Sequence, residues 1–185
     1  MITMGLLDEK KQENIAGYVI SMWHIEDLLR AEQFDLERLE EHLIAPMDAD
    51  PDTREEVRHW YADLVDQMKE QGIERNGHLL EVEEVMGELE FLHSTLVGVL
   101  DDHAYKVLYS AAEPGINALQ EQAGEDKQGP IATCFTAIYG VMLLRTQNKP
   151  ISKGTMEAEG HMRKLLEHLS VHYKQMRKLP GVSLN

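Results

Sequence analysis

The sequence predicts an all-helical fold, a single-domain antiparallel bundle of six long or medium helices and one short helix. Apolar residues recur at the three- and four-residue spacing of a helix face in six separate segments. Capping and turn residues lie between those segments. No stretch alternates apolar and polar residues between turn signals, as a half-buried strand does. We expect residues 1–185 to form one domain, since this length suffices for one core.

The first predicted helix spans about residues 8–32, with its apolar face running from Ile15 to Leu29. Asp35 suits the N-cap of a short helix that Pro46 ends. The inward residues expected of this short helix are Leu36, Leu39 and Leu43.

A loop over residues 46–52 precedes the next helix, whose start is predicted as a capping box at Thr53 and Glu56. The turn signal Asn76-Gly77 is expected to end this helix. Its apolar stripe is Val57, Trp60, Tyr61, Leu64, Val65 and Met68. The stripe of the following helix is Leu79, Val82, Val85, Met86, Leu89, Leu92, Leu96 and Leu100.

A further helix begins at about Asp102 and contains Pro114, where it is expected either to kink or to split. Pro130 suits the first turn of a helix over about 130–148. That helix is apolar on almost every side, so we expect it to be the central one. The last helix is expected over about 152–178.

The formal net charge of −15 argues against nucleic acid and against an anionic membrane surface as partners. The uncharged apolar run over 131–144 is too short to span a bilayer. With no recognisable secretory signal, a cytoplasmic location is expected. Residues 145–178 carry a local excess of positive charge, which either faces acidic neighbours in the same domain or docks an acidic partner. The single cysteine, Cys134, is expected to be a buried small side chain.

Glu-x-x-His occurs twice, at Glu56/His59 and at Glu90/His93, the spacing found in di-metal helical bundles. In a chain with nine histidines and many glutamates, such pairs also arise by chance. Glu56 and His59 fall opposite their apolar stripe, so a paired di-metal site is not expected.

Three histidines of the last predicted helix, His161, His168 and His172, fall within a narrow arc. Histidines at positions i and i+4 chelate metals in many proteins. The stripe is either a candidate metal site, which needs a further ligand from another helix, or a row of ordinary histidines at the border of the apolar face.

Glu26 lies in line with the apolar residues of the first predicted helix. A buried carboxylate is costly unless a partner meets it, and the candidates are His93, Arg75 or a tyrosine hydroxyl. The group Glu26, His93, Arg75 and Trp23 is therefore either a buried polar network that fixes helix register or the lining of a ligand pocket.

Two stretches, Asn14-Ile15-Ala16-Gly17-Tyr18 and Met22-Trp23-His24-Ile25-Glu26-Asp27-Leu28-Leu29-Arg30, resemble the start of a known family. The Gly77-His78-Leu79 step and the Ile151-Ser152 entry into the last helix are similar to it too. This family consists of short bacterial proteins described only as a domain of unknown function. The resemblance implies an all-helical fold and supplies no activity, cofactor or catalytic residue.

The sequence contains no nucleophile elbow, phosphate loop or dinucleotide fingerprint. The leading hypothesis is therefore a non-catalytic helical protein that self-associates or binds another protein, with no catalytic residue and no cofactor. The alternative is a small-molecule or metal-binding bundle, either a binding protein or an enzyme, with its site near Glu26 and His93 or on the histidine stripe.

Overall fold

The structure is a computed structural model that describes residues 4–178, and every regular element in this range is helical. The described chain divides into two compact units, residues 4–12 with 17–84 and residues 13–16 with 85–178. The predicted all-helical class is confirmed. The assignment of residues 1–185 to one domain stays a prediction.

The predicted helix over 8–32 is two helices, α1 (Met4–Glu13) and α2 (Ile15–Ala31). Residues 8–13 carry no apolar stripe, so nothing holds them in line with the helix that follows. The Oγ of Ser170, on the last helix, accepts a hydrogen bond of 3.3 Å from the backbone N–H of Ala16. This bond satisfies one of the free N–H groups at the start of α2.

Aspartates begin the next two helices of the first unit, α3 (Leu36–Leu39) and α4 (Pro51–Glu70). Asp35 caps α3, as predicted. The capping box at Thr53 was wrong, because Asp50 is the N-cap of α4 and its carboxylate accepts from both N and Oγ1 of Thr53. Pro51 then occupies the first turn, where its missing N–H costs nothing.

The helix α4 ends at Glu70, well before the predicted stop at Asn76-Gly77. Gly72 has a φ of +68°, and the N–H of Ile73 donates to the carbonyl of Met68 at 3.0 Å. This geometry is a Schellman motif, which closes a helix with glycine in the left-handed region.

Two short π-helical turns, η1 (Glu40–Ile44) and η2 (Thr95–Val99), change which residues face inward in the helices they extend. A π turn bonds residue i to i+5 and so rotates the residues after it around the helix axis. After Leu39 the next fully buried residue is Ile44, while Leu43 is half-buried. Likewise Leu100, which follows Leu96 by four, is 63% exposed instead of buried. The inward position of Leu36 was also wrong, as it is exposed at the start of α3.

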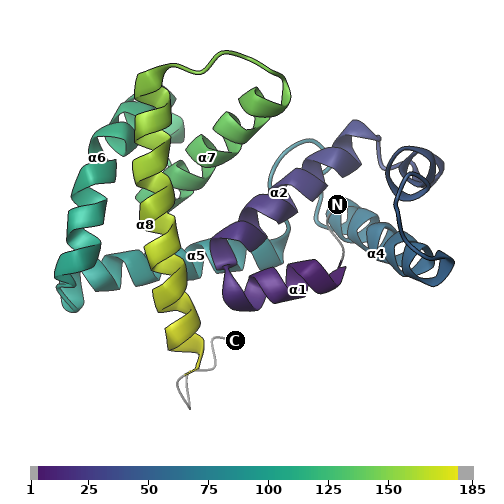
Figure 1. The fold of residues 1–185 in the computed structure, drawn as a ribbon, viewed down its shortest axis with the longest axis horizontal. Helices are drawn as coiled ribbons and strands as arrows, with labels where there is room; N and C mark the ends of the chain where they lie inside the picture. Colours follow the sequence, from purple (N-terminus) through teal and green to yellow (C-terminus); the bar gives the residue numbers. More distant parts are fainter. Residues whose placement is uncertain (1–3, 179–185) are drawn as a thin grey trace. The chain divides into compact units, whose positions relative to one another are not determined.

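The second unit contains most of α5 (Leu80–Ser94), then α6 (His103–Ala123), η3 (Gly124–Asp126), α7 (Pro130–Thr146) and α8 (Lys153–Arg177). Within it, α8 packs against both α6 and α7 (Figure 1). The helix α6 continues through Pro114 without splitting. The core side chains Tyr105, Phe135 and Leu165 are fully buried.

As predicted, α7 begins at Pro130. Its buried residues are Ile131, Thr133, Cys134, Phe135, Ile138 and Val141, whereas Thr136 is exposed. Farther along, Gly140 and Leu144 are half-buried and line a pocket. The predicted central helix thus has one side in the core and another on a cavity.

Candidate functional site

Glu26 is completely buried on α2, and both oxygens of its carboxylate have partners. The N–H of Leu79 donates to Oε1 at 2.9 Å, and Nδ1 of His78 lies 2.6 Å from Oε2. The indole of Trp23 stacks on the His78 ring at a centroid distance of 4.3 Å. These contacts tie α2 to the segment that leads into α5, so the carboxylate fixes a helix-to-helix connection.

The partners of Glu26 are His78 and Leu79, which corrects the expected pairing with His93 or Arg75. Arg75 is exposed, in the connection between α4 and α5. His93 is buried on α5, with Nδ1 2.8 Å from the hydroxyl of Tyr105. Burial lowers the pKa of His93, which keeps its ring neutral near pH 7.

His78 is the partner of Glu26 that sequence reasoning missed. It comes directly after Gly77, whose φ of +93° turns the chain toward α5. The sequence did contain one signal for a carboxylate at this place. The first N–H groups of the helix after Gly77 need an acceptor, and they attract a carboxylate. The sequence could not say which carboxylate that would be.

The histidine stripe of α8 divides in two. His161 is exposed, whereas His168 and His172 are half-buried and meet Asp102, the N-cap of α6. One ligand atom from each of these three residues lies within 4.8 Å of the other two. Oδ2 of Asp102 is 3.5 Å from Nε2 of His172. A metal site on the stripe needs a further ligand from outside α8, and Asp102 is a carboxylate in a suitable place.

The structure gives the two Glu-x-x-His pairs different surroundings. Glu56 and His59 are exposed on α4. Glu90 accepts hydrogen bonds from the N–H groups of Ile131 and Ala132, at 3.0 and 2.9 Å, and so closes the start of α7. Burial raises the pKa of Glu90, although these two bonds act to lower it.

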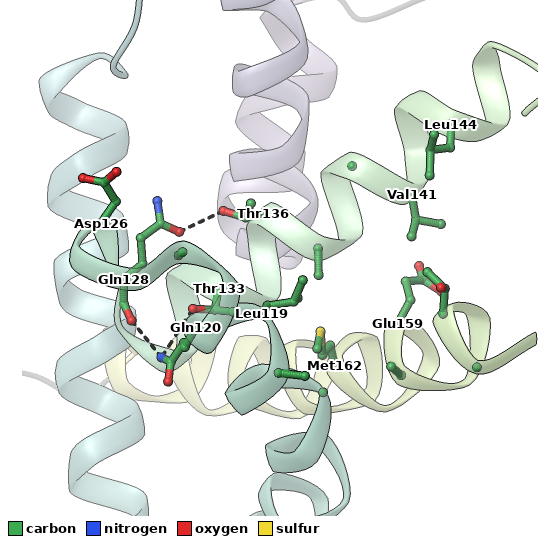
Figure 2. Close-up of a pocket in the computed structure, with 18 residues that line it drawn as sticks. Leu119, Gln120, Asp126, Gln128, Thr133, Thr136, Val141, Leu144, Glu159 and Met162 are labelled. Atoms are coloured by element: carbon green, nitrogen blue, oxygen red, sulfur yellow. Dashed lines mark hydrogen bonds between the residues drawn. The ribbon is translucent and has the colours of Figure 1, made fainter. Parts of the chain in front are cut away.

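A pocket of about 630 Å³ lies among α6, α7 and α8. Glycine and alanine make up much of its lining, and the absence of larger side chains there leaves the space open. Figure 2 shows Leu119 and Met162 at its middle, with Val141 and Leu144 toward one end. The small lining residues are Gly115, Ala118, Ala123, Ala137, Gly140, Gly154 and Ala158.

One end of the pocket is an uncharged polar cluster. Nε2 of Gln120 donates to the carbonyl of Gln128 at 2.7 Å and lies 3.5 Å from Oγ1 of Thr133 (Figure 2). The hydroxyls of Thr133 and Thr136 donate to the carbonyl of Gly129 and to Oε1 of Gln128. Among the described residues no donor meets Oε1 of Gln120, which leaves this oxygen as an acceptor.

At the other end lies Glu159, a buried carboxylate of α8. Arg163 donates to its Oε1 from Nε at 3.0 Å and also from Nη2, while Nη2 of Arg145 is 3.6 Å from Oε2. Two guanidinium groups thus offset the single negative charge.

Several basic residues of segment 145–178 pair with acidic groups within the second unit. Lys174 forms an ion pair with Glu13, and Arg163 and Arg145 meet Glu159. Such pairs are expected if the basic segment faces acidic neighbours in its own domain. Docking of an acidic partner stays a prediction.

The fold and the pocket define the class: an all-helical protein with a mostly apolar pocket among three of its helices. The chain belongs to the family described as Domain of unknown function (DUF4924), whose model matches residues 4–179. The family resemblance is thus confirmed. Comparison with curated proteins and with solved structures found no match. Within residues 4–178, no helix combines the length and apolar character needed to cross a membrane.

Proposed function

We propose that this protein is a binding protein whose α6–α7–α8 pocket holds a small, uncharged, largely apolar molecule carrying a hydrogen-bond donor. The observation that carries the proposal is the pocket itself. Its volume of about 630 Å³ lies in the range of small-molecule sites. Of the functions that the sequence left open, this geometry favours small-molecule binding.

The chemistry of the lining supports the class of ligand. Leu119, Val141, Leu144 and Met162 offer an apolar wall along the length of the pocket. Its two acidic lining residues, Glu159 and the exposed Asp126, are matched by the two guanidinium groups that meet Glu159. The charges around the pocket therefore sum to zero and favour neither an anion nor a cation. The free Oε1 of Gln120 accepts from a ligand hydroxyl or N–H.

We propose binding and not a reaction because the hydroxyls of two threonines in the lining are already engaged in hydrogen bonds to carbonyl oxygens. Thr133 and Thr136 both donate to carbonyl oxygens. Neither is hydrogen-bonded to a histidine or carboxylate that would act as a base, the arrangement that activates a nucleophile.

The test is a titration with N-phenyl-1-naphthylamine, a neutral apolar fluorophore with one N–H donor. The matched variants are Gly140→Leu and Gly87→Leu, two helical glycines where an added Cβ meets nothing within 4 Å. Gly140 lines the pocket, whereas Gly87 is exposed on α5. Both changes raise helix propensity, so both variants are expected to fold.

We expect saturable binding to the wild type and to Gly87→Leu, and affinity reduced about tenfold or more in Gly140→Leu, since the leucine fills the cavity. Equal affinity in all three proteins, or none in the wild type, contradicts the proposal. Displacement of the dye by 1-octanol and by its methyl ether tests the donor, because only the alcohol can donate to Gln120. Equal displacement removes the donor from the proposal.

Self-association is a second candidate. Three large apolar side chains are strongly exposed: Phe91 near the end of α5 at 69%, Val99 at the end of η2 at 80%, and Leu100 directly after it at 63%. Exposed apolar surface marks many interfaces. Light scattering across a concentration series is expected to show a dimer that Phe91→Ser weakens. A wild-type monomer at all concentrations removes this candidate.

A further inference from the structure

We propose that Asp102, His168 and His172 form a binding site for a divalent first-row transition-metal ion such as Zn²⁺ or Co²⁺. This site shares no residue with the pocket, and it stands independently of the proposed function.

The first support is the geometry of the donors. His168 and His172 are one helical turn apart on α8, with ring centroids 5.0 Å apart. In a tetrahedral complex with bonds of about 2.0–2.1 Å, ligand atoms lie roughly 3.3 Å apart. Nε2 of His172 and Oδ2 of Asp102 are 3.5 Å apart, and all three ligand atoms lie within 4.8 Å. Because all three ligand atoms lie within 4.8 Å of one another, side-chain rotations are expected to bring them to this spacing.

The second support is that the carboxylate is already oriented. Oδ1 of Asp102 accepts the N–H of Tyr105 at 2.9 Å as the N-cap of α6, which turns Oδ2 toward His172. Metal-bound carboxylates in proteins are commonly held by such outer hydrogen bonds.

The third support is the wall behind the imidazoles. The ring of Tyr105, completely buried, lies 6.1 Å from the ring of His168 and 6.5 Å from that of His172. His93 in turn holds the Tyr105 hydroxyl. The two ligand rings thus pack against a fixed aromatic surface on one side and are half-exposed on the other. Coordination positions on the exposed side remain for water.

The donor set selects the ion. Two imidazoles and one carboxylate suit Zn²⁺, Co²⁺, Ni²⁺ or Fe²⁺, whereas Mg²⁺ and Ca²⁺ prefer oxygen ligands throughout. The competing explanation is a simple ion pair between Asp102 and a protonated His172. An ion pair binds no metal, so the two explanations differ in a direct measurement.

The experiment is isothermal titration of the chelator-treated full chain with ZnCl₂, together with the absorption spectrum of the Co²⁺ complex. The variants are His168→Ala, His172→Ala and Asp102→Asn. Asparagine is itself a good N-cap, so Asp102→Asn keeps the start of α6. The matched control is His161→Ala, a histidine of the same helix that is exposed and outside the group.

We expect one high-affinity Zn²⁺ per chain, weakened about tenfold or more in each of the three ligand variants and unchanged in His161→Ala. The Co²⁺ spectrum should show visible bands in the wild type that His172→Ala abolishes. Three results overturn the proposal: no stoichiometric binding, ligand variants that bind as the wild type does, or an equal loss in His161→Ala.

Discussion

Glu26 illustrates how a buried charge is tolerated in this protein. A carboxylate without partners in an apolar environment costs several kcal/mol. Here both oxygens are met, one by the N–H of Leu79 and one by His78. The group therefore acts as a link between α2 and the start of α5, and we interpret it as structural.

Replacing Glu26 tests this interpretation. Glu26→Ala leaves the Leu79 N–H without its acceptor and opens a cavity, so the free energy of unfolding should fall by about 3 kcal/mol. Glu26→Gln keeps an acceptor and should lose less. Urea denaturation measures both, with Glu83→Ala, an exposed glutamate of α5, as the control. A Glu26→Ala variant as stable as the control contradicts the structural role.

Cys134 gives a second prediction at this scale. Its side chain is fully buried, and burial raises the pKa of the thiol to about 12. Thiolate is the reactive form, so the native protein should react with a disulfide reagent very slowly at pH 8. The reaction is followed by absorbance, with the urea-unfolded chain as the control, which should react with one equivalent at once. Rapid labelling of the native protein would show the prediction to be wrong.

At the scale of the elements, the first N–H groups of α7 depend on an acceptor from another helix. Gly129, its N-cap position, offers no side-chain hydrogen bond. Glu90 of α5 supplies the acceptor instead, and a Cβ on Gly129 would lie 2.3 Å from its Oε1. The glycine therefore makes room for the carboxylate that closes the helix.

This arrangement predicts a pH dependence. Since burial raises the pKa of Glu90 in the fold, its contribution to stability is fully present below the pKa of the unfolded chain and is lost as pH rises through the folded pKa. The melting temperature of Glu90→Gln, minus that of the wild type, should therefore increase between pH 4 and pH 7. Glu84→Gln, an exposed site on the same helix, should show no such trend. A constant or decreasing difference for Glu90→Gln rules the mechanism out.

At the scale of the whole molecule, α5 belongs to both compact units. Residues Leu80–Glu84 lie in the first and Val85–Ser94 in the second. A helix is cooperative, so melting one part withdraws support from the other. Folding of the two units is therefore expected to be coupled, in line with the single domain that the sequence predicts.

Scanning calorimetry tests the coupling. One transition is expected, with equal calorimetric and van't Hoff enthalpies. Glu26→Ala in the first unit and Leu165→Ala, a fully buried position in the second, should both lower that same transition. Two separate transitions, each moved by only one of the variants, would show that the units fold independently.

The sequence alone determined the helical class, the family and most of the buried stripes, because these depend on local spacing. The stripe from Val57 to Met68, the cap at Asp35 and the start of a helix near Asp102 follow from neighbours along the chain. The burial of Glu26 could also be predicted, since it lies in line with apolar residues.

Only the tertiary structure decided the contacts between segments that are distant along the chain. It placed His78 against Glu26, Asp102 against the histidines of α8, and Glu90 at the start of α7. It also decided the pocket, which exists because the small residues of α6, α7 and α8 face one another. Spacing along a chain specifies which face of a helix a residue occupies. Which face of another helix it meets depends on packing, and no local pattern carries that information.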